Sequence, residues 1–412
     1  MTVLIETTPK MDLALHDIAH LVEELRAYHA IYSPRFQRRE PRAAAHTSLQ
    51  GWLAPLPRKS IEPMVLAVDG VAPKAVRALQ SCSREGRWHD APLWPQHWQE
   101  VETDLGADEG VLMVDGSDVP KQGGHAGGVK RQSWGELGQR ATCPAGVCVG
   151  SVSPQGSTWR DRRLSLPVAW RTDAASAARR RPCGLPSEIT CKPKPALAQA
   201  RLAAGVKTPR LRCRWVVADE ACGDNPSVRE GGAGWGLWYG ADVPPTTRVW
   251  AERPAPPSPP WRGRGRRPPR ERLVEGAPEA RTVREVAAAL PAEFWTRPTL
   301  KEGSQGPMVA AFAALRVVAV RDTWPGPDVW LVRRRPLETG EVKTSLSNAP
   351  VDTAWATPGR MRGRRWPMAT CFEDGKPLLG MGDDAVRSWA GWPHQMTWVM
   401  LAHFFVVRMR LR

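Results

Sequence analysis

The sequence predicts a mixed α/β protein in which helices precede an α/β core and a β-rich insertion interrupts that core. Three patterns support this prediction. Apolar residues recur at helical spacing near the N-terminus. From Gly110 onwards, short apolar runs alternate with turns that contain glycine and proline, as expected of strands. Residues 261–272, WRGRGRRPPRER, are too rich in proline and arginine to pack into a core.

The chain is long and strongly basic. Its 412 residues allow two or three domains and a large core. Lys and Arg number 58 against 42 Asp and Glu, which gives a formal net charge of +16. Such a charge attracts polyanions, of which nucleic acid is the commonest, whereas no basic amphipathic helix indicates a membrane surface. Much of the excess is arginine, which suits bidentate phosphate contacts, although a codon-usage bias would give the same excess.

Cysteine usage and the termini predict a cytoplasmic protein with no membrane partner, associated with the nucleoid through DNA. The eight cysteines form no CxxC pair and no Cys/His ligand spacing, so we expect reduced thiols without zinc or disulfides. The first residues include Glu6, Lys10 and Asp12, which do not fit a signal peptide. The most apolar segment, residues 396–407, is too short to span a bilayer and is expected to be a core helix.

Residues 1–105 form a basic, helical N-terminal region in this prediction. Residues 11–28 have the spacing of an amphipathic helix, and a basic stretch follows at 35–42. Pro55 and Pro57 break the chain before a new helical start at Ser60. Two interpretations of this region remain open, a scaffold of packed helices or a domain that recognises DNA ends.

Residues 106–224 are expected to form the first part of the core. An apolar run, 111–114, ends at Asp115 in a glycine-rich turn, and further strands are predicted at 127–132, 144–152 and 164–170. A helix is predicted at 196–204, followed by a second apolar run, 215–218, that ends at Asp219. Strand, strand, strand, helix, strand is the order of a ribonuclease H-like core.

The second half divides into an insertion, 225–360, and C-terminal helices, 361–412, that complete the core. The insertion should be mostly β and should carry a basic Pro/Arg loop. Within it we expect a hairpin with strands at 316–321 and 329–332 and its turn at 325–328, then a turn at 338–341 and a strand at 342–346. Pro367 marks a helical start, and the last helix is expected at 397–409.

Two buried strands that each end in an aspartate suggest a divalent-metal site if the strands are neighbours. Taken alone, either Asp115 or Asp219 is more often a turn residue, because aspartate is common where strands end. Mg²⁺ takes hard oxygen ligands and keeps several waters, so a few carboxylates are enough to hold it.

Several sequence blocks resemble a known family. VDGSDVPKQGGHAGGVKRQSWGELG, WVVADEACGDN, KTSLSNAPVDT, RRWPMATCFEDGK and VRSWAGWPHQMTWVMLAHFF stand in this order. They resemble the bacterial insertion-sequence transposases of the 701 family, a branch of the DDE-type enzymes, as do RKSIEPM and the GRGRRPPRER loop. The resemblance covers nearly the whole chain. It implies a ribonuclease H-like core, with the insertion lying between the second Asp and the Glu of a carboxylate triad.

The resemblance implies roles for particular residues. The triad falls on Asp115, Asp219 and Glu373, as catalytic residues and as ligands of Mg²⁺, with Mn²⁺ as a possible substitute. The implied reaction cuts transposon ends and joins them to target DNA. The implied partner is double-stranded DNA, as terminal inverted repeats and target, bound by a homodimer.

Neighbouring residues compete for these roles. Asp118, Asp224 and Asp374 each lie close in sequence to a triad member. Lys376, one helical turn after Glu373, is the stronger candidate for a DNA contact, and Lys121 and Lys130 are weaker ones that also fit solvated turn lysines. His125 fits a loop histidine better than a ligand.

Departures from the family pattern leave a second function open. Cys222 stands where the family usually has an aromatic residue, and Trp (20) greatly outnumbers Tyr (3) and Phe (6). The alternative is a catalytically decayed or recruited DNA-binding protein derived from a transposase. A third interpretation is an unrelated metal-dependent nuclease, which would cut DNA without joining ends.

Overall fold

The computed structural model describes most of the chain, in two compact units. The described residues are 15–84, 88–119, 121, 124–134, 139–209, 211–255, 273, 276–297, 299–303, 306–336, 342–353, 371–383 and 386–412. We call Thr8–Arg214 together with Arg364–Arg412 the core unit, and Trp215–Gly363 the β unit, which also includes Met1–Thr7. The predicted mixed α/β class, with N-terminal helices and a β-rich segment in the second half, is confirmed.

The core unit begins with helices, as predicted. These are α1 (Leu15–Tyr32), the 3₁₀ turn η1 (Ser33–Arg35), α2 (Arg39–Leu53), α3 (Ile61–Asp69), α4 (Pro73–Arg84) and α5 (Leu93–Leu105). Ser60 is the N-cap of α3, so the predicted helical start is confirmed. Lys59 holds the end of α2, because its buried ammonium group donates to the carbonyls of Trp52 and Ala54.

Four antiparallel strands follow. They are β1 (Val111–Asp118), β2 (Val129–Trp134), β3 (Gln139–Ser153) and β4 (Gly156–Ser165), and β3 pairs with each of the other three. Strand β1 does not end at Asp115 as predicted. It continues to Asp118, because its pairing with β3 runs without a break from Val111↔Val152 to Asp118↔Ala145.

The predicted strand at 164–170 is wrong beyond Ser165. Pro167 cannot donate to a strand ladder, and its carbonyl instead accepts from the amide of Trp170 at 3.0 Å, which starts the helix α6 (Ala169–Thr172). The indole of Trp170 is fully buried and donates to the Val129 carbonyl at 2.8 Å. The apolar LSLPVAW run therefore turns a corner at the sheet edge.

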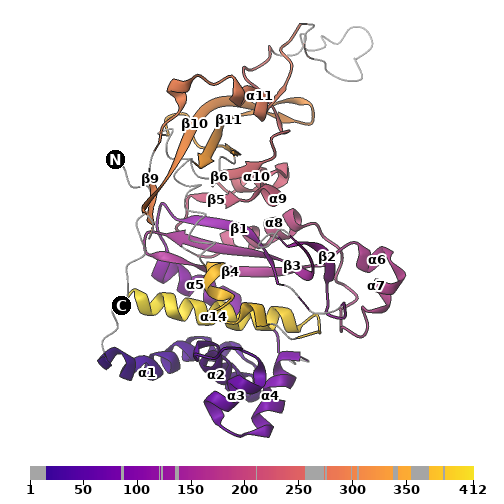
Figure 1. The fold of residues 1–412 in the computed structure, drawn as a ribbon, viewed down its shortest axis with the longest axis vertical. Coiled ribbons are helices and arrows are strands. Elements are labelled where there is room, and N and C mark those ends of the chain that lie inside the picture. The colour runs from indigo at the N-terminus through magenta and orange to yellow at the C-terminus, as the bar shows by residue number, and fades with distance from the viewer. Residues whose placement is uncertain are drawn as a thin grey trace. The chain divides into compact units, whose positions relative to one another are not determined.

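Helices cover both faces of the core-unit strands. The remaining ones are α7 (Ala174–Ala178), α8 (Lys194–Val206), the 3₁₀ turn η3 (Met381–Asp383) and α14 (Gly391–Arg410). Consecutive residues on β4 point to opposite faces. Arg162 reaches α14, whereas Asp161 reaches Arg201 of α8. The two helices therefore lie on opposite faces, and Figure 1 shows α14 running along the strands.

Helix α14 is a core helix, as predicted, although it begins at Gly391 and not at Thr397. Most of its side chains are buried, among them His394 and His403. The His403 ring is hydrogen-bonded to Thr158 at 3.0 Å. Strand β4 and the helices of the N-terminal region surround α14, so nearly all of its faces are buried. This burial explains why its sequence is apolar on all sides.

The β unit is built on a mostly antiparallel sheet. Strand β5 (Trp215–Ala218) pairs in parallel with β6 (Trp238–Val243), and the order continues through β12 (Lys343–Ser347), β11 (Trp324–Pro336), β10 (Gly306–Arg321), β7 (Arg248–Trp250) and β8 (Arg281–Thr282). Strand β9 (Thr299–Gly303) pairs with the start of β10. The short helices are α9 (Glu220–Gly223), α10 (Pro226–Gly234), α11 (Val283–Ala288) and the 3₁₀ turn η2 (Ala292–Phe294).

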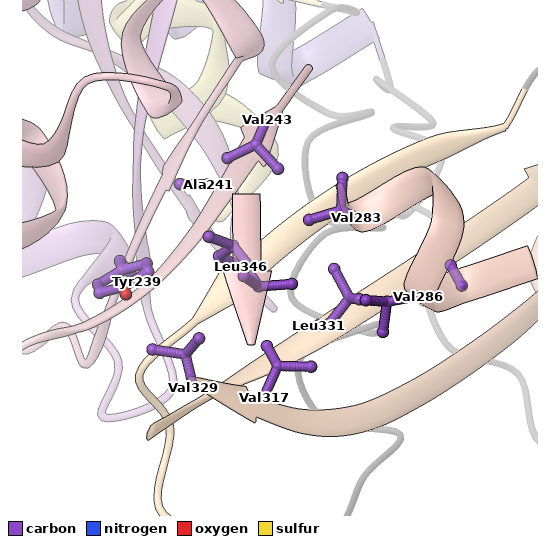
Figure 2. Close-up of a cluster of buried hydrophobic side chains, with 11 residues drawn as sticks. Tyr239, Ala241, Val243, Val283, Val286, Val317, Val329, Leu331 and Leu346 are labelled. Atoms are coloured by element: carbon purple, nitrogen blue, oxygen red, sulfur yellow. The ribbon is translucent and has the colours of Figure 1, made fainter. Parts of the chain in front are cut away.

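Helix α11 packs on this sheet through a buried apolar cluster, shown in Figure 2. Val283 and Val286 of α11 meet Val317, Leu331 and Leu346 from three neighbouring strands. A capping box between Thr282 and Glu285 starts the helix. The cluster gives the β unit a hydrophobic core of its own.

The predicted hairpin is present, but its turn lies elsewhere. The turn consists of Asp322 and Thr323, both with positive φ (48° and 72°), and Arg321 pairs directly with Trp324. Two residues with positive φ are the signature of a two-residue type I′ loop, which matches the twist of the flanking strands. Pro325–Asp328 was predicted to be the turn and instead lies in β11, where Pro325 pairs with Val320 next to a bulge.

Of the remaining predicted elements, some are confirmed and others lie outside the described residues. The predicted helix at 196–204 and strands at 215–218 and 342–346 are confirmed as α8, β5 and β12. The predicted turn at 338–341, the start at Pro367 and the basic loop at 261–272 lie outside the described residues. All eight cysteines are free thiols in this structure. In the described part of the chain, no helix is long and apolar enough to cross a membrane.

We expect the buried histidines to make stability depend on pH. Burial lowers the pKa of His97 and His394 to about 4 and that of His403 to about 3. Unfolding returns each histidine pKa to its ordinary value near 6.5. Below that pH the unfolded chain therefore binds protons that the folded chain does not bind. Each histidine therefore contributes stability that is present above pH 6.5 and is lost as pH falls towards its folded pKa.

The variant His403→Gln tests this. Between pH 6 and 5 its free energy of unfolding should fall less steeply than that of the wild type, by up to ~1.4 kcal/mol per pH unit, the value of one proton. Urea denaturation across this range measures both slopes. Equal slopes would show that His403 does not stay neutral in the fold.

Candidate active site

Asp115 is held by the strand that carries it. Val111, Leu112, Met113 and Val114 before it are fully buried, and Asp115 itself is half-buried. Its Oδ1 accepts a hydrogen bond from the Gly116 amide at 2.8 Å. Because the strand is fixed by its pairing with β3, the carboxylate has a defined position at the point where β1 leaves the core.

Asp118 lies three residues further along β1 and is engaged by a lysine. Its Oδ1 lies 3.7 Å from Nζ of Lys194, the first residue of α8. Burial raises the pKa of Asp118, while the charges of Lys194 and then Lys376 lower it, and Asp115 raises it. Asp115, Asp118 and two lysines therefore share one electrostatic environment.

A buried thiol reports the negative charge of this region. Cys148 lies opposite Asp115 on β3. Burial raises the pKa of the Cys148 thiol above its usual range, and the charges of Asp115, Asp161 and Asp118 raise it further. A region that disfavours an additional negative charge favours a cation.

Glu373 lies on a short helical segment, residues 371–375, that packs against β4. The ring of Phe372 meets Trp159 edge to face, with centroids 5.4 Å apart. Cys371 is hydrogen-bonded to Ser157 of β4 at 3.2 Å. Glu373 is exposed and Asp374 half-buried, so the two neighbouring acids face different surroundings.

The register relates this segment to Asp115 within the core unit. Trp159 pairs with Gly150 on β3, and Gly150 pairs with Met113 on β1. Asp115 lies two residues beyond Met113 and therefore on the same face of β1. Phe372, next to Glu373, packs on Trp159 at the β4 end of this row. Asp115 lies two residues after Met113, which is the β1 end of the row.

The Glu373 segment is also anchored at its far end. Asp383 accepts from the backbone amide of Lys59 at 2.8 Å. Met381 and Leu379 are buried. The RKSIEPM block thus supports the segment that carries Glu373.

Asp219 belongs to the β unit. It follows β5, whose four residues are all buried, and it is the N-cap of α9. Its Oδ1 accepts from the Cys222 amide at 3.1 Å. Cys222 is buried behind this turn. The competing acid Asp224 is at the C-cap of α9 and accepts from the Thr247 hydroxyl at 3.3 Å.

The three lysines predicted to contact DNA have different surroundings. Lys121 donates to the Val386 carbonyl at 3.1 Å, so its ammonium group binds protein. Lys130 is exposed on β2, opposite Cys143. Lys376 is half-buried and acts on Asp118. Sequence reasoning missed Lys194, whose only local signal is the basic KPKP stretch ahead of a helix.

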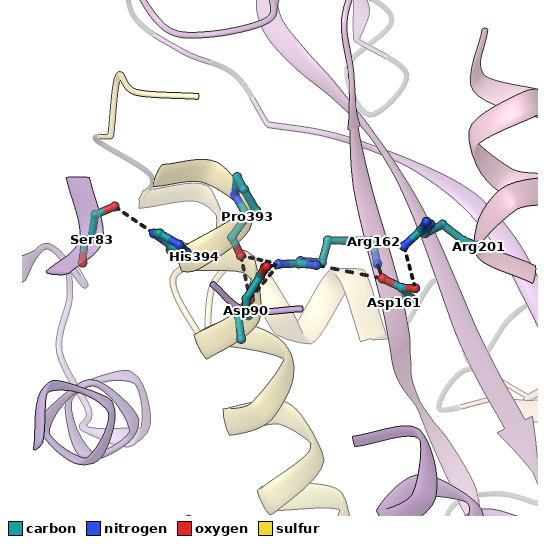
Figure 3. Close-up of polar contacts among 8 residues, drawn as sticks. Ser83, Asp90, Asp161, Arg162, Arg201, Pro393 and His394 are labelled. Carbon is teal, nitrogen blue, oxygen red and sulfur yellow. Dashed lines mark hydrogen bonds and ion pairs between the residues drawn. The ribbon is translucent and has the colours of Figure 1, made fainter. Parts of the chain in front are cut away.

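A buried charged network next to these strands is structural (Figure 3). Arg162 donates to the Pro393 carbonyl at 2.9 Å and to the Thr397 hydroxyl at 2.8 Å, and it pairs with Asp90. The pKa of Asp161 is raised to about 6, because burial outweighs the opposing charge of Arg201, which lies 3.6 Å away. These groups join β4 to α8 and α14, and nothing in the local sequence predicts them.

The donor chemistry of the acids fits a divalent cation. Asp115, Asp219 and Glu373 offer carboxylate oxygens, the ligands that Mg²⁺ prefers. Among the residues that the structure describes, no three His, Cys, Asp or Glu side chains are gathered closely enough to form a ready-made metal cluster. Mg²⁺ commonly needs only one or two carboxylates, with waters and substrate phosphates completing its shell.

Comparison with known proteins identifies the family. A family model described as "DDE superfamily endonuclease" matches residues 32–307, well over half of the chain. The chain belongs to this superfamily, so the predicted DDE-type enzyme is confirmed, and members normally use divalent metal ions. The match contains Asp115 and Asp219 and ends before Glu373.

One solved structure that the comparison finds similar to this chain is the piggyBac transposase synaptic complex with hairpin DNA. It has a TM-score of 0.42 and 11% identity, over 95% of this chain and 71% of that chain. This is too distant to transfer residue roles. No curated protein sequence matches the chain.

Gly375 provides a test of how the Glu373 segment is held. A Cβ on Gly375 would lie 2.5 Å from the ring of Trp159, which is fully buried and cannot move away. We expect Gly375→Ala to cost ~1–3 kcal/mol of stability through overpacking. Gly382→Ala is the matched control, since its Cβ would meet nothing closer than 4.0 Å. Thermal unfolding measures both, and an equal effect of the two variants would contradict the packing described.

Proposed function

We propose that this protein is a DNA transposase that cuts transposon ends and transfers the freed strand to target DNA. The observation that carries the proposal is the setting of Asp115. In a chain of the DDE superfamily, the half-buried carboxylate of Asp115 lies within β1, directly after its four fully buried residues, in a negative environment. Asp219 and Glu373 are proposed as the other two acids, from their sequence blocks and from their places at a strand end and on a packed helical segment.

The three proposed acids share one task, which is to hold a divalent ion. Asp115, Asp219 and Glu373 would hold Mg²⁺, or Mn²⁺ in its place. When bound, such ions activate a water and stabilise the leaving oxygen of a phosphodiester. The chain contributes position: β1 and β5 fix the two aspartates, and Trp159 fixes the segment of Glu373.

Neighbouring acids are second choices for stated reasons. Asp118 already lies beside Lys194, and Asp224 accepts from Thr247. The pKa of the Cys371 thiol is raised to about 12, mainly by burial, and the negative charge of Asp374 contributes to this rise. The choice of Asp115, Asp219 and Glu373 over these acids rests on the sequence blocks that carry them.

The proposed partner is double-stranded DNA, as terminal inverted repeats and target, bound by a homodimer. The net charge of +16 supports a polyanion. Lys376, Lys121 and Lys130 are retained as proposed DNA contacts, with Lys121 the weakest because it binds Val386. We also propose the division into 1–105, 106–224, 225–360 and 361–412, with DNA recognition in the first segment.

A second candidate is a DNA-binding protein that has lost catalysis. It is favoured by Cys222, which is small and buried where an aromatic residue is usual in the resembled transposases. Both candidates predict DNA binding that weakens steeply with salt. Only the transposase predicts nicking that requires a divalent ion.

Single alanine variants separate the two candidates. Asp115→Ala, Asp219→Ala and Glu373→Ala should each lower Mg²⁺-dependent nicking by ~10³-fold or more, because each removes a ligand of the ion. A labelled duplex that carries the terminal repeats measures nicking, and its binding should persist in all three variants.

Asp118→Asn, Asp224→Asn and Asp374→Asn are the matched controls and should retain most of the nicking activity. Metal-dependent nicking that survives all three alanine variants would contradict the site. A wild-type protein that binds DNA but never nicks it would favour the second candidate. Nicking without strand transfer would indicate a simple nuclease.

A further inference from the structure

Three arginines of the β unit gather on one face of its sheet. Arg333 and Arg335 alternate along β11 and therefore point to the same face as Leu331, which packs under α11. Arg284 is an exposed residue of α11 itself. The three side chains thus meet where the apolar contact between α11 and the sheet ends.

This cluster is not neutralised within the described residues. The pKa of Arg333 is lowered, first by burial and then by the charges of Arg335 and Arg284. Its Nε is buried and has no hydrogen-bond partner there, and among the described residues no ion pair joins any of the three arginines to an Asp or Glu. Like charges held together cost stability, and such a cost is typical of a site kept for a ligand.

The neighbouring strand leaves room for the cluster. Arg333 lies opposite Ala313 and Arg335 opposite Ala311 on β10. The guanidinium group of Arg335 lies 4.9 Å from the ring centroid of Trp295. Trp295 precedes Thr296, which bridges to Phe312 on the other edge of β10. Arg335 therefore lies beside the small side chain of Ala311, and the contact with Trp295 fixes its direction.

We propose that Arg284, Arg333 and Arg335 form a binding site for the backbone phosphates of duplex DNA, contained within the β unit. Guanidinium groups present paired donors that match phosphate oxygens. Alternate residues on a strand are about 7 Å apart, so Arg333 and Arg335 can engage different phosphate oxygens. The inference rests on the proposed function, because it takes DNA as the polyanion.

The test uses the full chain and a labelled 25-base-pair duplex in EDTA, so that cleavage does not interfere. In the double variant Arg284→Gln/Arg335→Gln, both changes are at exposed positions. The slope of log affinity against log salt should become shallower by about 2, with roughly ten-fold or greater weakening near 0.1 M salt. Arg321→Gln is the matched control, an arginine of the same hairpin that pairs with Glu230 at 2.6 Å, and it should leave the slope unchanged.

Stability provides a second readout. If the three arginines repel one another, Arg335→Gln should keep or raise the melting temperature at low salt. A lower melting temperature together with unchanged DNA binding would show a structural role and overturn the proposal.

The remaining outcomes are distinguishable. A double variant with the wild-type slope would overturn the phosphate site while leaving the proposed function intact. Displacement of DNA by sub-millimolar inorganic phosphate at constant ionic strength would show a small-anion site and would also overturn it. A wild-type protein that does not bind the duplex at all would count against the proposed function as well.

Discussion

The antiparallel ladder from β4 through β3 to β1 is the constraint on which the core unit depends. It places Arg162 opposite Cys148 and Cys148 opposite Asp115. A slip of one residue would move every side chain of a strand to the other face. Arg162 would then leave Asp90 and the α14 residues Pro393 and Thr397, and its charge would be buried without a partner. Buried charges therefore hold the register of β4 against β3, the strand that in turn pairs with β1 and Asp115.

The same strand supports the third acid. Trp159 of β4 receives Phe372 and leaves no space for a side chain at Gly375, so the segment of Glu373 packs on the ladder that also positions Asp115. Two acids that are 258 positions apart in the sequence, 115 and 373, thus depend on one sheet in one unit. The helices around it hold neutral, buried histidines, which links the stability of this arrangement to pH.

Local patterns in the sequence predicted what local forces determine. The start of α3 at Ser60, the helix α8 and the strand β5 follow from capping and from apolar spacing. The hairpin turn was misplaced because Pro325 is a stronger turn signal than Asp322 and Thr323, whose positive φ values arise from strand pairing. The strand expected through Trp170 failed because tertiary burial of its indole outweighed its β propensity.

In the candidate site, too, local sequence patterns predict only part of the arrangement. Asp115 and Asp219 could be singled out because an apolar run precedes each one, and Glu373 because of the family resemblance. Lys194 could not, because only folding brings α8 to Asp118. The pairs formed by Arg162 and Asp161 were equally hidden, since their partners lie on distant helices. The arginine cluster of the β unit depends on strand alternation and on two small residues of the neighbouring strand, which become meaningful only with the register known.

Asp115, fixed by β1, is proposed above all as a ligand of the divalent ion. Anomalous diffraction from crystals of the intact protein soaked in Mn²⁺ tests it without relying on activity. We expect an anomalous peak bound by the carboxylate of Asp115, and we expect this peak to be absent in Asp115→Ala crystals. A peak held instead by Asp118 or Asp374, and unchanged in the variant, would contradict it.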